Sequence, residues 1–221
     1  MIPVAFDYER ATSAEQALSL LAEHGDDAKL IAGGHSLLPL MKYRLAAPAV
    51  LIDIGRLEEL SYIRDEGGEL AIGALTRHFD VEHSDLVQSQ VGLLAAATAE
   101  VGDPQVRHRG TIGGAMAHGD PASDLPAALI ALRGSLVIDG PSGRRQVDAD
   151  SFFTGFLETA LSEEEMLVEV RVPKMPESTW SFQKFNRRAQ DWAIVGSAAV
   201  SYTHLRAHET VLDLVCRLLL E

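Results

Sequence analysis

The chain has 221 residues and a formal net charge of −13, from 19 Lys and Arg against 32 Asp and Glu. This acidic balance argues against nucleic acid or an anionic membrane as the partner, and no apolar run approaches the ~18 residues that a membrane-spanning helix needs. A single cysteine, Cys216, excludes an internal disulfide and a cysteine-ligated iron–sulfur cluster within the chain, and residues 1–7 lack the basic and apolar regions of a signal peptide, so we expect a cytoplasmic protein.

The N-terminal part predicts a small βαβ unit. Thr12 to Glu15 has the pattern of a capping box, and the apolar helical face that follows it ends at Gly25. A buried strand, a short helix and a second strand then follow at 28–32, 37–44 and 49–53. This places the glycine pair at Gly33 and Gly34 at the carboxyl end of a strand, where open α/β sheets bind ligands.

The pattern changes near residue 57, where helical periodicity gives way to alternation. Turn residues at 65–68 and 140–143 each separate two alternating segments, as in a β-hairpin. The expected strands are 60–63, 69–72, 135–139, 144–147, 168–172 and 182–185, and the expected helices are 76–82, 86–101 and 124–132. The fold class is therefore α+β, with a small parallel subdomain followed by a larger one that contains antiparallel strands and helices.

Two glycine-rich loops are the candidate binding elements. Paired glycines allow positive φ, so consecutive N–H groups can converge on phosphate oxygens, and both Ala32 to Ser36 and Thr111 to Ala115 carry such a pair. Neither loop matches the Rossmann or P-loop fingerprint, because Gly-x-Gly-x-x-Gly and Gly-Lys-Ser/Thr are both missing. Two loops from different subdomains that share one pyrophosphate remain possible, whereas Gly67 and Gly68 are interpreted as a turn.

Three motifs, in this order and separation, resemble one known family. They are Ala32-Gly33-Gly34-His35-Ser36-Leu37-Leu38-Pro39, Gly110-Thr111-Ile112-Gly113-Gly114 and Gly119-Asp120-Pro121-Ala122-Ser123-Asp124-Leu125-Pro126. Together they resemble the FAD-binding medium subunit of molybdenum hydroxylases, of the carbon monoxide dehydrogenase and xanthine dehydrogenase kind. The resemblance runs from Ile2 to about Ala199 and implies a PCMH-type FAD-binding fold.

The resemblance also implies a division of the chain. Residues 1–56 would form the N-terminal FAD-binding subdomain, 57–177 the second FAD-binding subdomain, and 178–199 the start of a C-terminal flavoprotein domain that is cut short. The stretch Val200 to Thr210 reads like a translated sequencing-library adapter, so we expect residues 200–221 to be non-native. The amphipathic helical pattern at 211–220 is given no functional weight.

By resemblance, the two glycine loops would hold the FAD pyrophosphate, mainly through backbone N–H groups with help from the Ser36 and Thr111 hydroxyls. Relatives often carry a polar residue at the position of Ala115, so one side-chain contact would be lost here. The residues implied are Ala32, Gly33, Gly34, His35 and Ser36 in the first loop, and Thr111, Ile112, Gly113, Gly114 and Ala115 in the second.

Five further positions match family residues around the cofactor, and each has a plainer alternative. Asp124 would lie near the ribose or the ribityl chain, or could cap a helix. Val101 would lie near the isoalloxazine and Leu161 in the adenine pocket, although both could be core residues. Lys184 would stabilise negative charge on the reduced ring, or be a solvated strand lysine, and Trp192 would cover the ring, or pack in the core.

We expect no metal site and no catalytic residue of the chain's own. His35, His108 and His118 fit no compact zinc spacing, and no cysteine supports them. His118 and Asp120 could suggest acid–base chemistry, but the Asp-Pro pair is more consistent with a shaped loop. No nucleophile and base stand in a recognisable arrangement.

The sequence thus favours an FAD-dependent electron-transfer subunit. The resemblance implies that FAD accepts electrons from a [2Fe–2S] small subunit and passes them to an external acceptor, while a separate large subunit carries the molybdenum cofactor in a dimer of heterotrimers. Two alternatives stay open: a stand-alone FAD-dependent oxidoreductase of the same fold, and a nucleotide-binding module without redox activity. The substrate and the acceptor cannot be read from the sequence.

Overall fold

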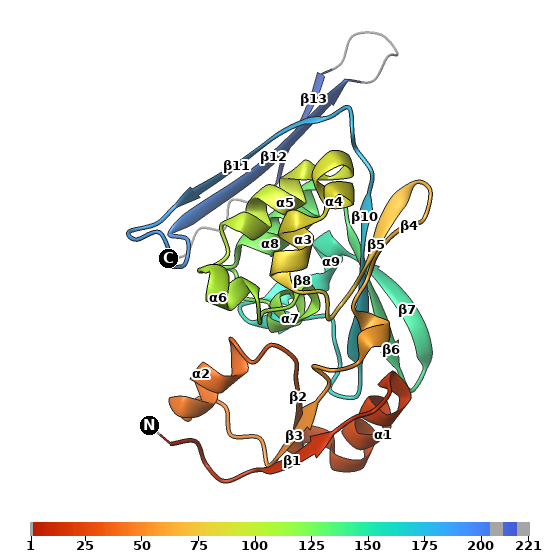
Figure 1. The fold of residues 1–221 in the computed structure, drawn as a ribbon, viewed down its shortest axis with the longest axis vertical. Coiled ribbons are helices and arrows are strands. Elements are labelled where there is room, and N and C mark those ends of the chain that lie inside the picture. The colour runs from red at the N-terminus through yellow and green to blue at the C-terminus, as the bar shows by residue number, and fades with distance from the viewer. Residues whose placement is uncertain (1, 204–209, 216–221) are drawn as a thin grey trace.

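The computed structural model describes residues 2–203 and 210–215, which form four β-sheets and a set of helices (Figure 1). The N-terminal part contains β1 (Asp7–Arg10), α1 (Ala14–His24), β2 (Ala28–Ile31), α2 (Leu37–Lys42) and β3 (Val50–Asp53). The middle contains β4 (Ile63–Asp65), β5 (Glu69–Gly73), α3 (His78–His83), α4 (Asp85–Gln90), α5 (Gly92–Ala99), α6 (Pro104–Arg107), α7 (Ile112–His118), α8 (Asp124–Ala131), β6 (Ser135–Gly140), β7 (Gly143–Asp148), α9 (Ala149–Phe152), β8 (Phe153–Gly155), β9 (Glu158–Thr159) and β10 (Met166–Pro173). The last strands are β11 (Thr179–Phe185), β12 (Val195–Thr203) and β13 (Thr210–Val215).

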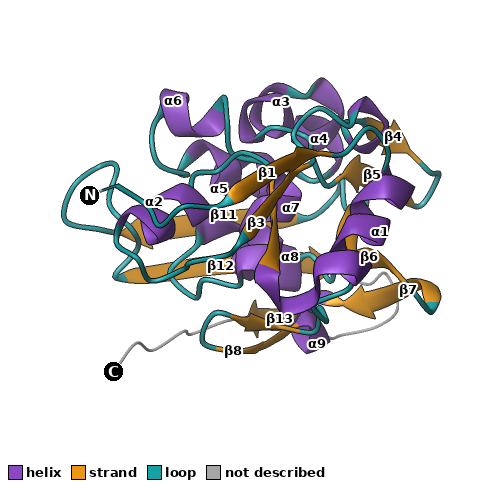
Figure 2. Cartoon of the chain, turned by 90° about the horizontal axis from the view of Figure 1, so that it is seen from below, coloured by secondary structure: helices purple, strands orange, loops and turns teal. Residues whose placement is uncertain are grey.

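The N-terminal strands form a parallel sheet in the order β1-β3-β2, with α1 and α2 to either side of it (Figures 1 and 2). The predicted βαβ unit is confirmed as β2, α2 and β3, whereas β1 was not predicted. The helix cap lies one residue later than expected: Ser13 is the N-cap and accepts from the Gln16 N–H, and the Gln16 side chain accepts from the Thr12 N–H at 2.7 Å. Gln16 therefore completes the cap in place of Glu15.

The largest sheet has the strand order β4-β5-β10-β6-β7, and all its pairs are antiparallel. The side chains of β10 divide between two core clusters, because they alternate between the two faces and a register shift between Leu167 and Glu169 reverses the alternation. Leu167, Val170 and Val172 pack with the helices, while Met166 and Val168 pack with α1 and the parallel sheet. Both predicted hairpins are confirmed, although the first begins at Ile63 after a 3₁₀ turn at Glu58–Leu60.

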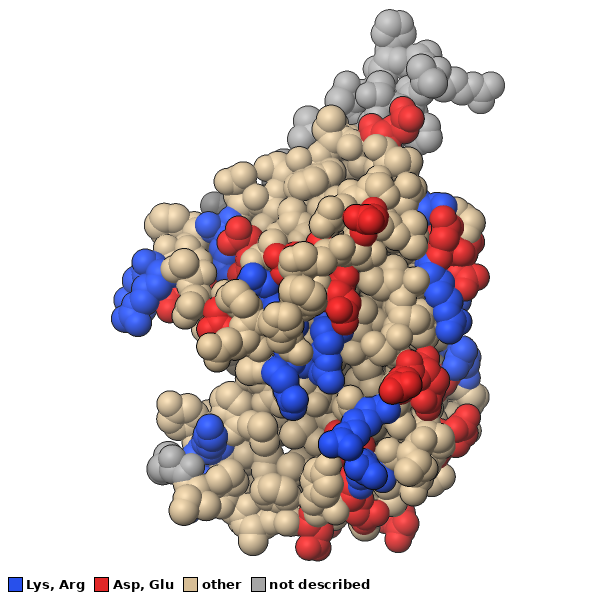
Figure 3. Space-filling view, in the orientation of Figure 1, with Lys and Arg blue, Asp and Glu red and all other residues tan. Residues whose placement is uncertain are grey.

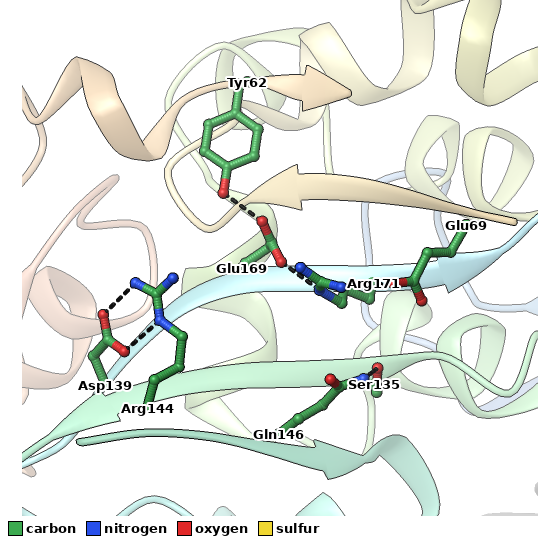
Figure 4. A network of polar contacts seen from close by, with 8 residues as sticks. All are labelled: Tyr62, Glu69, Ser135, Asp139, Arg144, Gln146, Glu169 and Arg171. Atoms are coloured by element: carbon green, nitrogen blue, oxygen red, sulfur yellow. Dashed lines mark hydrogen bonds and ion pairs between the residues drawn. The ribbon is translucent and has the colours of Figure 1, made fainter. Parts of the chain in front are cut away.

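The rest of the face opposite the helices is polar (Figure 4). The Tyr62 hydroxyl donates to Glu169 at 2.6 Å, and Arg171 donates to both Glu169 and Glu69 at 2.6 Å. Burial and the neighbouring Glu169 raise the pKa of Tyr62 to about 12. Each of these polar side chains has a hydrogen-bond or ion-pair partner on the same face of the sheet.

Two expectations about helices are wrong. The helix predicted at 86–101 is two helices, α4 and α5, that meet at Val91. Gly92, which has a low helix propensity, follows this junction. Its Cα faces the Trp180 indole so closely that a Cβ would lie 2.9 Å from the ring. In the tail, residues 210–215 form β13, which pairs with β12, where a helical pattern was noted. The remaining residues of that pattern, and Cys216, lie outside the described residues, and the subdomain boundaries at 56 and 177 stay a prediction.

Candidate functional site

The structure brings the two glycine-rich segments together at one cavity of about 590 Å³. Figure 3 shows the molecule hollowed between its N-terminal part and the helices above it, with Lys and Arg side chains at the rim. A cavity of this size is in the range of cofactor sites. Every predicted site residue lines it except Ile112 and Gly113: Ala32, Gly33, Gly34, His35, Ser36, Val101, Thr111, Gly114, Ala115, Asp124, Leu161, Lys184 and Trp192.

The first loop connects β2 to α2 and has the expected conformation. Gly34 adopts φ 75°, which a residue with a side chain rarely adopts. Within the part of the chain that the structure describes, the N–H groups of Gly33, Gly34, His35 and Ser36 donate to no protein acceptor. Four consecutive free donors at a cavity wall are suited to an anion.

The first loop also touches the second segment directly. A Cβ on Gly33 would lie 2.3 Å from the Arg109 carbonyl oxygen and 2.9 Å from the Gly110 Cα. Only a glycine allows this approach. The two glycine-rich segments are therefore in contact at the cavity and face the same space.

The second segment is a helix and not a loop, which corrects the prediction. Gly113 and Gly114 have no positive φ and lie in α7, whose N-cap is Thr111. Gly113 is buried, and a Cβ there would lie 2.5 Å from the Ala74 Cβ. This glycine allows α7 to pack against the end of β5, so its role is in the fold.

The backbone donors of the second segment are mostly used inside the protein. The N–H groups of Ile112 and Gly113 donate to the Thr76 and Ala74 carbonyls, and those of Gly114 and Ala115 donate to the Thr111 hydroxyl and carbonyl at 3.1 Å. Of the N–H groups in this segment that we expected to bind the pyrophosphate, that of Thr111 donates to no acceptor among the described residues and stays open to a ligand. The first loop is the stronger anion site.

Asp124 and Lys184 form a buried ion pair at the cavity wall. Their side chains are 6% and 3% exposed, and the Lys184 Nζ lies 2.8 Å from the Asp124 Oδ2 and donates to the Glu100 carbonyl at 2.8 Å. The alternative of a solvated lysine is wrong, and so is that of Asp124 as helix cap, because Ser123 holds the N-cap position. Burial raises the pKa of Asp124 to about 6, against the opposing effect of Lys184.

One oxygen of this pair has no protein partner. The Asp124 Oδ1 is buried and accepts no hydrogen bond from the described residues. An unpaired buried carboxylate oxygen is costly unless a ligand or water supplies a donor. Since Asp124 lines the cavity, this oxygen is a ready acceptor for a ligand hydroxyl.

The apolar predictions divide into two kinds. Val101 and Leu161 are half-buried, line the cavity and also pack against the main core. Their core interpretation is confirmed, and their contacts with FAD stay a prediction. Trp192 is 61% exposed at the cavity, which makes core packing wrong for this residue. Its ring is free to lie against a ligand.

No metal site is found among the described residues, because no group of three or more His, Cys, Asp or Glu could hold an ion there. His118 lies 4.0 Å from Asp120, whose Oδ1 accepts from the Ala122 N–H at 2.8 Å. This turn supports the interpretation of Asp120 as a residue that shapes the loop. No described helix is both long and apolar enough to cross a bilayer.

His78 was missed by the sequence analysis. It is 4% exposed, lines the cavity, and its Nδ1 has no partner among the described residues. Burial lowers its pKa to about 4, so its imidazole is neutral at pH 7. No local pattern signals this, because its burial depends on the contact of its ring with Gly110, which is distant in sequence.

Comparisons with known proteins agree with this geometry. Residues 4–175 match the family model described as the FAD binding domain in molybdopterin dehydrogenase. The chain is 50% identical over 201 residues to the carbon monoxide dehydrogenase medium chain of Hydrogenophaga pseudoflava, covering 90% of this chain and 70% of that one. It is 31% identical to the xanthine dehydrogenase FAD-binding subunit of Escherichia coli O157:H7, covering 87% and 67%. A solved carbon monoxide dehydrogenase from Hydrogenophaga pseudoflava that lacks the Mo-pyranopterin moiety superposes with a TM-score of 0.91 at 47% identity, over 97% of this chain and 74% of that one.

Proposed function

The chain belongs to the family of FAD-binding domains of molybdopterin dehydrogenases, as an FAD-dependent oxidoreductase subunit, and we propose that the cavity between its two glycine-rich segments is where FAD binds. The observation that carries this proposal is the pairing, in one cavity, of four free backbone donors at Gly33 to Ser36 with one unpaired buried acceptor at Asp124. A dinucleotide offers the complementary groups, since its diphosphate accepts hydrogen bonds and its sugar hydroxyls donate them.

We assign the residues as follows. The N–H groups of the first loop bind phosphate oxygens, with the Ser36 hydroxyl beside them. The Asp124 Oδ1 accepts from a hydroxyl of the ribityl chain or ribose, while Lys184 holds the opposite oxygen and keeps the carboxylate in place. Leu161 contacts the adenine, and Val101 and Trp192 contact the isoalloxazine.

Bound FAD supplies the redox chemistry, because it takes electrons from one centre and gives them to another. In our proposal the donor is the [2Fe–2S] cluster of a small partner subunit, and substrate is oxidised at a molybdenum cofactor in a large partner subunit. The complex is a cytoplasmic dimer of such heterotrimers, and an external acceptor reoxidises the flavin. The chain's own residues bind and orient the cofactor and exclude water from it.

Reconstitution with FAD tests the proposal. Purified full-length chain is titrated with FAD and, separately, with ADP, and binding is followed by calorimetry and by flavin absorbance. We expect about tenfold weaker FAD binding by Asp124→Asn, since a hydrogen bond to a charged group contributes about 1.5–3 kcal/mol. Asp65→Asn is the matched control, because Asp65 pairs with Lys174 at the surface and its loss should leave FAD binding unchanged.

The two titrations also locate the hydroxyl that Asp124 binds. If Asp124→Asn weakens FAD but not ADP, the partner is the ribityl chain, whereas equal losses indicate the adenosine ribose. A folded wild-type chain that takes up no FAD from a large excess would contradict the proposal.

A further inference from the structure

Arg77 joins the two sides of the cavity although it does not line it. Its backbone forms an isolated antiparallel bridge with Thr111, the N-cap of α7. Its guanidinium Nη1 donates to the Arg109 carbonyl, and its Nη2 donates to the Gly55 carbonyl at 3.3 Å. One side chain thus links the end of the N-terminal part to the segment that leads into α7.

Both carbonyl groups belong to segments that position the first glycine loop. The Arg109 carbonyl oxygen is the atom against which Gly33 packs, with only 2.3 Å available to a Cβ. On the other side, Gly55 lies so close to the loop that a Cβ would be 3.1 Å from the Ala32 carbonyl oxygen. The guanidinium therefore fixes two neighbours of the loop relative to each other.

The Arg77 bridge is a polar connection between the two parts, next to the first glycine loop. The apolar cluster that joins them consists of residues of α1 and the parallel sheet packed against Leu75, Val137, Met166 and Val168 of the larger part. A guanidinium is suited to this bridge, because its planar fork can donate to two acceptors at once. A lysine ammonium in the same place would keep the charge but lose the fork.

We propose that Arg77 is a positioning residue for the dinucleotide site: its bridge between the Gly55 and Arg109 carbonyls sets the spacing of the first glycine loop from Thr111, and so the affinity for FAD. This inference rests on the proposed function. It predicts that geometry, and not positive charge, is what Arg77 contributes.

Two substitutions separate geometry from charge. Arg77→Lys keeps the charge, and Arg77→Gln removes it. FAD dissociation constants are measured by titration of the full chain, with Arg64→Gln as the control, because Arg64 is an exposed arginine that lies over the Tyr62 ring, 4.0 Å from its centroid. We expect both Arg77 variants to bind FAD about tenfold more weakly, consistent with the loss of a charge-assisted hydrogen bond, and Arg64→Gln to bind like the wild type. An Arg77→Lys variant with wild-type affinity would overturn the inference.

A distance measurement tests the Arg77 bridge without any ligand. Spin labels are attached at Glu23→Cys on α1 and Gln105→Cys on α6, both exposed positions, with Cys216→Ser, and the inter-label distance distribution is recorded by pulsed electron resonance. Arg77→Lys should broaden the distribution in the absence of FAD, and saturation with FAD should narrow it again. An unchanged distribution in the ligand-free variant would contradict the inference. A wild-type chain that binds no FAD would instead contradict the proposed function, because the ligand-free comparison still stands.

Discussion

Replacing Lys184 by methionine removes the cation that faces the buried carboxylate of Asp124. Both side chains are almost completely buried, so water does not take the place of the lost ammonium group. The native Asp124 carboxyl then stays protonated to higher pH, because its charged form has lost its partner. In the wild type the pKa of this carboxyl is raised to about 6, which fixes the pH at which the two proteins start to differ.

The magnitude follows from that pKa. Below about pH 6 the carboxyl is protonated in both proteins, so Lys184→Met breaks no charge pair. Above it the wild type gains about 1.4 kcal/mol per pH unit from ionisation that the variant lacks. With the carboxyl of the variant still protonated at pH 8, we expect a loss in the free energy of unfolding of about 1 kcal/mol at pH 7 and about 3 kcal/mol at pH 8. The second value reaches the lower end of the range known for broken buried pairs.

Urea unfolding of the ligand-free chain, followed by circular dichroism at pH 5.5, 7 and 8, measures this loss. The double variant Asp124→Asn/Lys184→Met is the control, since it has no carboxyl to titrate at this position and its loss should not grow as the pH rises. If Lys184→Met alone lost the same stability at pH 5.5 and pH 8, the ion pair would not be the cause and the reasoning would be wrong.

Further predictions concern the glycine contacts and the buried histidine. Gly33→Ala should abolish FAD binding by pushing the two segments apart, whereas Gly68→Ala, with no atom within 4 Å of its Cβ, should bind normally; comparable affinities in a titration would contradict this. Gly113→Ala should lower the free energy of unfolding by about 1–3 kcal/mol through overpacking, measurable in urea, and an unchanged midpoint would count against the packing described. The wild type binds fewer protons at His78 when folded, so His78 favours folding above about pH 6.5 and this contribution is lost as the pH falls toward 4. Between pH 6.5 and pH 4, His78→Phe should therefore lose about 3 kcal/mol less free energy of unfolding than the wild type. Free energies of unfolding that change in parallel with pH in the two proteins would refute the lowered pKa of His78.

Much of the fold follows from local patterns. The two hairpins, the helix that ends at Gly25 and the strand at 168–172 were predicted because alternation, helical periodicity and turn residues are properties of neighbouring residues. The errors arise where a distant contact decides. The helix predicted at 86–101 is interrupted at Val91, next to Gly92, whose Cα lies against the ring of the distant Trp180. Residues 210–215 form a strand because β12 offers them a pairing edge.

The site shows the same division. Gly34 needs a positive φ for a local reason, so the first glycine loop was predictable as a loop with free donors. Gly113 looks identical in the sequence, yet its N–H is used by Ala74 and its missing side chain makes room for that residue. Nothing close to it in the chain distinguishes a glycine that meets a ligand from one that meets a strand.

The sequence by itself determined the hairpins, the βαβ unit, the family motifs and most of the residues that line the cavity. The tertiary structure alone decided which of their polar atoms are left free, because each N–H or carboxylate oxygen is either used by a distant partner or open to a ligand. Lys184 donates to one oxygen of Asp124 and no described residue donates to the other, while Arg77 connects the Gly55 and Arg109 carbonyls beside the first loop. These are contacts between residues far apart in sequence, and hydrogen bonds of that kind exist only once the chain has folded.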